Sequence, residues 1–130
     1  MASTITLSVN VEVQSGPKSS YSLVETVEAY ALTEVVIPKS TAAPGKEVPI
    51  VPGGPGQVRV LAITSDRYTG IKFKAQDNVP AVGPEITLDA PQLFLGSTVA
   101  LLGKTPNSLL FTNASATDDA NVRILVGRKI

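Results

Sequence analysis

Residues 5–13 read ITLSVNVEV, and this stretch decides the fold class. Every second residue is aliphatic, and every residue between two aliphatic ones is polar. A period of two puts all the aliphatic side chains on one face of an extended chain, which is typical of a strand with one buried face. Turn-forming residues follow at 15–20, so the strand ends there. The stretch therefore predicts a protein of the all-β class.

The rest of the chain repeats this pattern in short segments separated by glycine and proline. Strands are predicted at 21–37, 57–64, 71–76, 86–89, 99–102, 109–112 and 122–126, with a short apolar piece at 93–95. Helical spacing in 21–37 is outweighed by its β-branched residues, which favour one strand or two strands with a bulge. About eight short strands without a secure helix predict one β-sandwich or barrel domain over residues 1–130. A jelly roll is the favoured topology, and an immunoglobulin-like sandwich is the alternative.

A proline- and glycine-rich segment at 38–56 interrupts the strands. Proline has no backbone N–H to donate, so this segment is not expected to form an inner strand. Val48, Ile50 and Val51 nevertheless make its middle apolar enough to lie along an edge. Long loops of this kind are usually functional. Two interpretations remain open: the segment extends onto a neighbouring subunit, or it covers an edge of the chain's own sheet.

The composition excludes most catalytic and metal-binding chemistry. The 130 residues include no His, no Cys and no Trp, and 11 Lys and Arg balance 11 Asp and Glu. Without His or Cys, a zinc site of these residues, a Ser-His-Asp triad and a Cys-His pair are all excluded. A neutral chain without a basic stripe is not expected to bind nucleic acid. The sequence therefore predicts a protein that is not an enzyme and uses no cofactor or metal ion.

The C-terminal region holds the remaining charged candidates. Asp118 and Asp119 could offer oxygen ligands to calcium, but EF-hand spacing is missing, so a polar turn is favoured. Arg123, Arg128 and Lys129 make the last strand basic. These cations fit either pairing with acidic groups of a neighbouring subunit or ordinary solvated charge.

The low charge content indicates a subunit of an assembly. Charged residues make up 17% of the chain, against about 25% in an average protein, and 43% of the residues are hydrophobic. A surface so thinly charged is expected to carry apolar area that a partner covers, unless it is an uncharged β surface rich in Ser and Thr. The first residues lack the features of a signal peptide, and the apolar run 90–103 is too short to cross a membrane. The chain is expected to be made in the cytoplasm, without a signal peptide or membrane contact.

Three segments near the C-terminus resemble small structural proteins of tailed bacteriophages, in particular capsid cement or decoration proteins. They are 86–96, 109–113 and 121–128. The likeness lies in alternating apolar strands, an asparagine turn and a Val-Gly-Arg ending, and it includes no catalytic or ligand motif. It implies a β-sandwich subunit on the exterior of an icosahedral capsid that bridges and stabilises capsomers.

The partners that follow are the major capsid protein or other virion subunits and further copies of the chain, with a trimer favoured over a dimer. The alternative is a tail, baseplate or fibre subunit that binds a carbohydrate or a cell-surface receptor. Candidate interface residues come from the proline-rich segment, the short apolar piece and the basic strand. They are Val48, Ile50, Val51, Leu93, Phe94, Leu95, Arg123 and Arg128.

Overall fold

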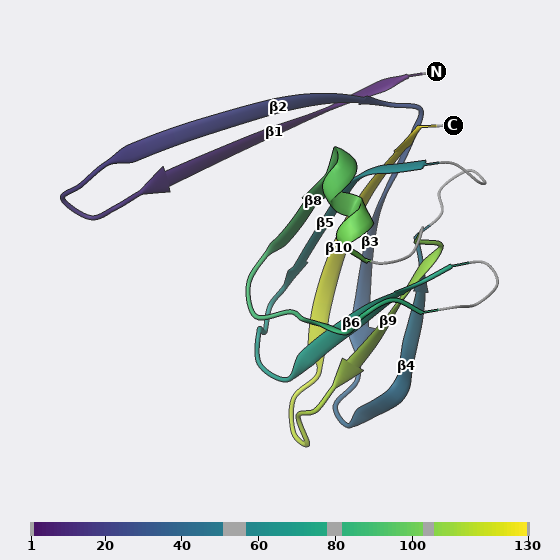
Figure 1. Cartoon of the computed structure of the whole chain (residues 1–130). Coiled ribbons are helices and arrows are strands. Elements are labelled where there is room, and N and C mark those ends of the chain that lie inside the picture. Colours follow the sequence, from purple (N-terminus) through teal and green to yellow (C-terminus); the bar gives the residue numbers. More distant parts are fainter. Residues whose placement is uncertain (1, 51–56, 78–81, 103–105, 130) are drawn as a thin grey trace.

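Three antiparallel sheets make up the computed structural model, which describes residues 2–50, 57–77, 82–102 and 106–129 (Figure 1). One sheet is a hairpin of two strands, and the other two have four strands each. The elements are β1 Ser3–Glu12, β2 Lys18–Val27, β3 Ala29–Ile37, β4 Thr41–Pro49, β5 Gln57–Ser65, β6 Ile71–Gln76, β7 Ile86–Thr87, β8 Gln92–Leu95, the 3-10 helix η1 Gly96–Leu102, β9 Ser108–Asn113 and β10 Ala120–Lys129. The prediction of an all-β chain is confirmed.

The two four-stranded sheets face each other as a sandwich. Their strand orders are β3-β10-β5-β8 and β4-β9-β6-β7. From β3 onward, consecutive strands lie in different sheets except β6 and β7, which pair with each other, and the last strand, β10, inserts between β3 and β5. This arrangement of interleaved Greek keys is a jelly roll, so the favoured topology is confirmed. The sheets end in separate edge strands, which identifies a sandwich and not a closed barrel.

Alternation along each strand builds the core between the two sheets. Ile71, Phe73 and Ala75 of β6 are buried, and the residues between them face outward. The ring of Phe73 packs on that of Phe111 from β9, with ring centroids 5.7 Å apart at an interplanar angle of 33°. A tilted aromatic pair of this kind adds to the stability that apolar burial already supplies. Phe111 lies on an inner strand and is therefore a central residue of the core.

The segment 38–56 differs from the prediction over its described part. It contains a strand, β4, which pairs with β9 at the edge of its sheet. Val48 and Ile50 are buried in the chain's own core, so the idea that they lie on a neighbouring subunit is wrong. Edge placement was predicted correctly, since an edge strand tolerates prolines. Val51 lies outside the described residues.

Gly45 lets β4 approach β9 closely. Its φ of +101° lies in a region that favours glycine, and a Cβ added there would come within 2.5 Å of the carbonyl oxygen of Phe111. The pairing of the two strands shifts in register between Thr41 and Lys46, around this glycine. A proline-rich stretch thus joins the sheet through an irregular edge strand.

The predicted strand at 99–102 is wrong, because these residues belong to the 3-10 helix η1. Val99 and Leu102 are its buried residues, and a spacing of three places both on one side of a 3-10 helix. The sequence also predicts a hairpin of 99–102 with 109–112 through the turn residues between them, and this is wrong because β9 pairs with β4 and β6. Among the described residues, no helix is long and apolar enough to cross a membrane.

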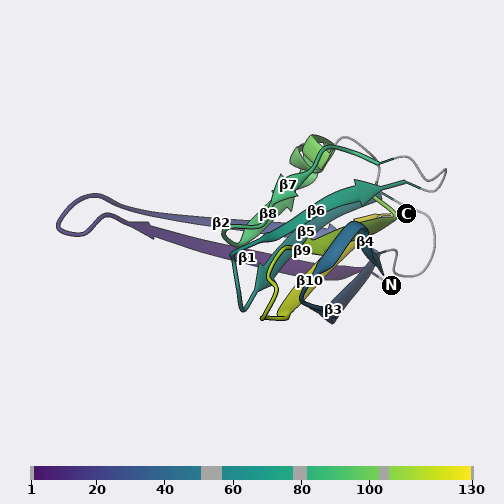
Figure 2. The same ribbon diagram turned by 90° about the horizontal axis from the view of Figure 1, so that it is seen from below.

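The hairpin of β1 and β2 projects far beyond the sandwich (Figures 1 and 2). Its residues come from the predicted strand 5–13 and from the first half of 21–37. The segment 21–37 divides into two strands, which is one of the two interpretations that the sequence left open. The division falls at Glu28, whose N–H donates to the carbonyl of Arg128, 2.7 Å away. We call this hairpin, Ser3 to Val27, the arm.

Candidate interaction surface

The two faces of the arm differ in chemistry. Residues directly opposite each other in an antiparallel pair lie on the same face, and Leu7 is opposite Leu23 while Val9 is opposite Tyr21. We define the arm face as Leu7, Val9, Val11, Tyr21 and Leu23. All of these except Leu7, which is half-buried, are exposed, with Tyr21 at 62%.

The opposite face of the arm is mostly polar. Ser8 lies opposite Ser22, and Asn10 lies opposite Ser20. The hydroxyl of Ser20 donates to Asn10 Oδ1 across the strands at 2.8 Å. The arm is therefore amphipathic, and its apolar side lacks cover in the described part of the chain.

The base of the arm rests on the outer face of the β3-β10-β5-β8 sheet. A Cβ added to Gly127 of β10 would lie 2.7 Å from Ile5 Cδ1 and 3.0 Å from Val27 Cγ1. The glycine thus leaves room for the side chains of the arm to sit directly on the sheet. Val60, on the neighbouring strand β5, lies in the same contact and is fully buried.

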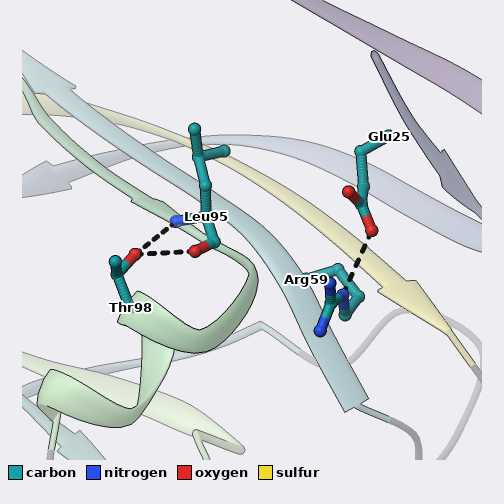
Figure 3. A network of polar contacts seen from close by, with 4 residues as sticks. All are labelled: Glu25, Arg59, Leu95 and Thr98. Carbon is teal, nitrogen blue, oxygen red and sulfur yellow. Dashed lines mark hydrogen bonds and ion pairs between the residues drawn. The ribbon is translucent and has the colours of Figure 1, made fainter. Parts of the chain in front are cut away.

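A bulge in β5 adds a charged contact to this base. The register of β5 against β10 steps from Val60 to Val58 between Gly127 and Arg128, so Arg59 is the extra residue. Its guanidinium binds Glu25 of the arm, with Nε 3.1 Å from Oε1 (Figure 3). Both side chains are mostly buried, so this ion pair holds the direction of the arm as well as its base.

A turn beside this ion pair begins η1. The N–H of Leu95 donates to Thr98 Oγ1 at 2.7 Å, and that hydroxyl donates back to the Leu95 carbonyl at 2.8 Å (Figure 3). These bonds stop β8 and turn the chain, which explains why the apolar run does not continue as a strand.

We expect a double-mutant cycle on Glu25→Gln and Arg59→Gln to give a coupling of about 1 kcal/mol in the free energy of unfolding. The reason is that this ion pair is partly buried, so water screens the attraction between the two charges only weakly. The matched control is the exposed pair of Glu12 and Lys18 at 3.4 Å near the tip, where the coupling should be close to zero. Equal couplings at the two pairs, measured by urea unfolding, would show that Glu25 and Arg59 do not fasten the arm.

The outer face of the same sheet carries a second uncovered apolar surface. Leu32 is paired with Leu125, Leu125 with Ala62, and Ala62 with Leu93 across four strands. We call these four residues the apolar row. Leu32 is 55% exposed, Leu93 is exposed, and the two central residues are half-buried.

The apolar row lies between two other rows of the sheet. On one side, Gly127 and Val60 form the row that the base of the arm covers. On the other side, Arg123 of β10 binds Glu34 of β3, with Nε 2.9 Å from Oε1. Along the strands, this outer face therefore carries first an apolar row that the arm covers, then the uncovered apolar row, and then a charged row.

The predicted interface residues divide between the inside and the outside of the sandwich. Leu93, Leu95 and Arg123 lie on the outer face of the β3-β10-β5-β8 sheet, in the three rows just described. Val48, Ile50 and Phe94 are buried in the core, and Arg128 is buried as well. Burial lowers the pKa of the Arg128 guanidinium. Arg128 is thus not the solvated surface charge expected from the sequence, and Arg123 pairs within its own chain.

The acidic side chains near the other end of the sheet hold turns together. Asp66 accepts hydrogen bonds from the Asn121 backbone N–H at 2.8 Å and from its side-chain amide at 2.9 Å. These bonds, the side-chain one foremost, hold the pKa of Asp66 below its usual value. Asp119 accepts from the Lys39 N–H at 2.8 Å, and Asp118 accepts from Thr117 at 3.0 Å. The favoured polar turn matches these contacts.

Sequence reasoning missed the arm face. The alternation in 5–13 predicted a strand with a buried face, but in the structure that face is uncovered beyond Leu7. Strand length gave no signal, because β10 within the sandwich has ten residues, as many as each strand of the arm.

A β-sandwich of jelly-roll topology that carries a projecting amphipathic arm is the class that fold and surface define. No family model matches the chain, and neither a curated protein nor a solved structure matches it.

Proposed function

We propose that this protein is a non-enzymatic structural subunit of a virion, a capsid cement subunit that binds the exterior of the shell and bridges capsomers of the major capsid protein. The observation that carries the proposal is the arm, whose apolar face extends from a jelly roll without cover in the described chain. A cement subunit acts through contact alone. It needs a firm body and an apolar surface that reaches across a boundary between subunits.

The body of the molecule suits this role. Jelly rolls are used by viral capsid domains and also by lectins, so the fold by itself leaves both roles open. The chemistry of the uncovered surfaces separates them. Most of the uncovered side chains, among them Val9, Val11, Leu32 and Leu93, are aliphatic, and Tyr21 is the one aromatic side chain of the arm face. Aliphatic side chains recognise protein surfaces, whereas sugars are bound by polar groups together with aromatic faces. Cement function is therefore favoured over carbohydrate binding.

Repetition makes a modest contact sufficient. Each large aliphatic side chain that a partner covers contributes about 1.5 to 3 kcal/mol before the costs of association. On a symmetric shell the same contact recurs at every equivalent position, and linked contacts bind far more tightly than one. A small subunit can thus stabilise a large shell without a catalytic group.

The location of the chain in purified particles tests this function. Particles of the phage that encodes the chain are separated into shells and tails, and the chain is quantified in each fraction by mass spectrometry. We expect it in shells, in a fixed ratio to the major capsid protein. Its presence in tails alone would overturn the cement assignment in favour of a tail, baseplate or fibre subunit, and its absence from both would overturn a virion role.

Rebinding to stripped shells tests the surface. The variant Val9→Ser with Val11→Ser should lose binding to shells from which the chain has been removed, because it makes the arm face polar. The matched control is Ser8→Ala with Ser22→Ala on the opposite face, which should bind as the unchanged chain does. Equal binding of both variants would assign the shell contact to another surface.

A further inference from the structure

The base of the arm already makes a contact with the sheet, and this contact is a pattern for how the uncovered arm face could pack on the uncovered apolar row. At the base, aliphatic side chains of the arm lie on the outer face of the β3-β10-β5-β8 sheet at Gly127 and Val60. Further out, the same side of the arm continues as the arm face, with no sheet beneath it in the described chain (Figures 1 and 2). On the sheet, the apolar row continues next to the base without an arm above it.

We propose that the arm face of one copy docks on the apolar row of a second copy, so that the subunits assemble by exchanging arms. Each chain carries both halves of this contact, the arm face and the apolar row. The docked arm extends the contact seen at its own base to a second sheet of identical sequence. This inference deepens the proposed function, on which it rests for its role in the virion: the arm face bridges two copies of the subunit, and the oligomer formed in this way is the unit that binds the shell.

The dimensions of the two surfaces match. A strand rises about 3.3 Å per residue, so the part of β1 from Leu7 to Glu12 extends for about 20 Å. Four strands about 4.8 Å apart span about 14 Å, which is the length of the apolar row from Leu32 to Leu93. The arm can therefore cover the whole row. At its base it already crosses the strands β10 and β5, the direction in which the row runs (Figure 1).

The charges around the contact also fit a second copy. Neither the arm face nor the apolar row contains a charged residue. Arg123 and Glu34, which border the row, neutralise each other within one chain. With equal numbers of acidic and basic residues, two copies carry no net charge that would hold them apart.

One docked arm makes a small contact, because the arm face has five residues and the apolar row has four, fewer than the roughly 20 to 30 residues that each side of a standard interface supplies. In a symmetric exchange every subunit donates one arm and receives one, so each pair of copies in a dimer makes two such contacts. A hairpin of two strands is marginally stable alone in water, and docking gives its apolar face the packing partner that it lacks.

Cross-linking tests the docking directly, because the chain has no cysteine of its own. Two single variants, Val9→Cys and Leu93→Cys, are mixed and oxidised. We expect a disulfide between the two variants. Ser8→Cys mixed with Leu93→Cys is the matched control and should remain uncross-linked, since Ser8 lies on the opposite face. Equal yields in the two mixtures, or disulfides formed only between two copies of Val9→Cys, would overturn the proposal in favour of no face-specific contact or of arms that pair with each other.

The mass in solution provides the second measurement. We expect the unchanged chain at about 10 µM to sediment at two or three times the 13.5 kDa of one chain. Leu32→Glu should raise the dissociation constant by about 30-fold or more, because it places a charge in the apolar contact, whereas Val82→Glu, at an exposed aliphatic position outside both surfaces, should leave it unchanged. A single-chain mass for the unchanged protein would overturn the docking. If that protein still binds shells, only this inference fails, and if an arm-exchanged oligomer is absent from particles, only the cement function fails.

Discussion

Phe111→Ala is expected to lower the free energy of unfolding by about 3–5 kcal/mol, which is about a fifth or more of the total stability of a typical domain. Phe111 is fully buried on the inner strand β9 and packs on Phe73. Alanine leaves a cavity between the sheets that β9 cannot close, because the strand is held on both sides by β4 and β6. The partner ring loses its aromatic contact at the same time. Urea unfolding followed by circular dichroism measures the change.

The control for this variant is Leu101→Ala. Leu101 is 69% exposed on η1, so its truncation should change the free energy of unfolding by no more than about 0.5 kcal/mol. A similar loss for the two variants would mean that the core lies elsewhere than between these sheets.

Ile50→Ser is expected to destabilise the isolated chain by about 3 kcal/mol or more. Ile50 is 4% exposed in the core, so serine removes apolar contacts and buries a hydroxyl in their place. The position also decides between the two interpretations of the proline-rich segment. A residue that is buried only against a partner would leave the unfolding of the isolated chain unchanged when it is replaced.

Thermal and urea unfolding at low concentration give the result for Ile50→Ser, with Leu101→Ser as the exposed control. Stability equal to that of the unchanged chain, together with loss of binding to shells, would return Ile50 to an interface between subunits. The structure leads us to expect the reverse outcome, a less stable chain whose arm and apolar row are intact.

The alternation of apolar and polar residues correctly predicted the strands that have one buried face and one exposed face. The predicted segments 57–64, 71–76, 109–112 and 122–126 each lie within a strand of the structure, because a period of two is a local property of the sequence. The run 99–102 was misassigned, since an apolar residue every third position suits a 3-10 helix and a short strand alike. What decides between them is the turn at Thr98, which depends on a side-chain hydroxyl and not on hydrophobicity.

The interaction surface was harder to predict, for a topological reason. Leu93 and Phe94 are adjacent and equally apolar, yet one lies outside the sandwich and the other inside. The pattern shows that they point in opposite directions but not which direction leads to the core. In the same way, the alternation at 5–13 identifies an apolar face without showing whether a second sheet covers it. Only the strand order places this face on an arm.

The position of β10 couples the arm to the completion of the sandwich during synthesis. Of the strands in Figure 1, β10 is the last to leave the ribosome, whereas the arm is the first. Gly127, on which the base of the arm rests, belongs to β10. A nascent chain therefore has its arm long before it has the strand on which the base of the arm rests. A copy that ends before β10 has a hairpin without a fixed direction. Synthesis order thus places the aiming of the arm after the closure of the sandwich: a copy can direct its arm only once β10 lies between β3 and β5.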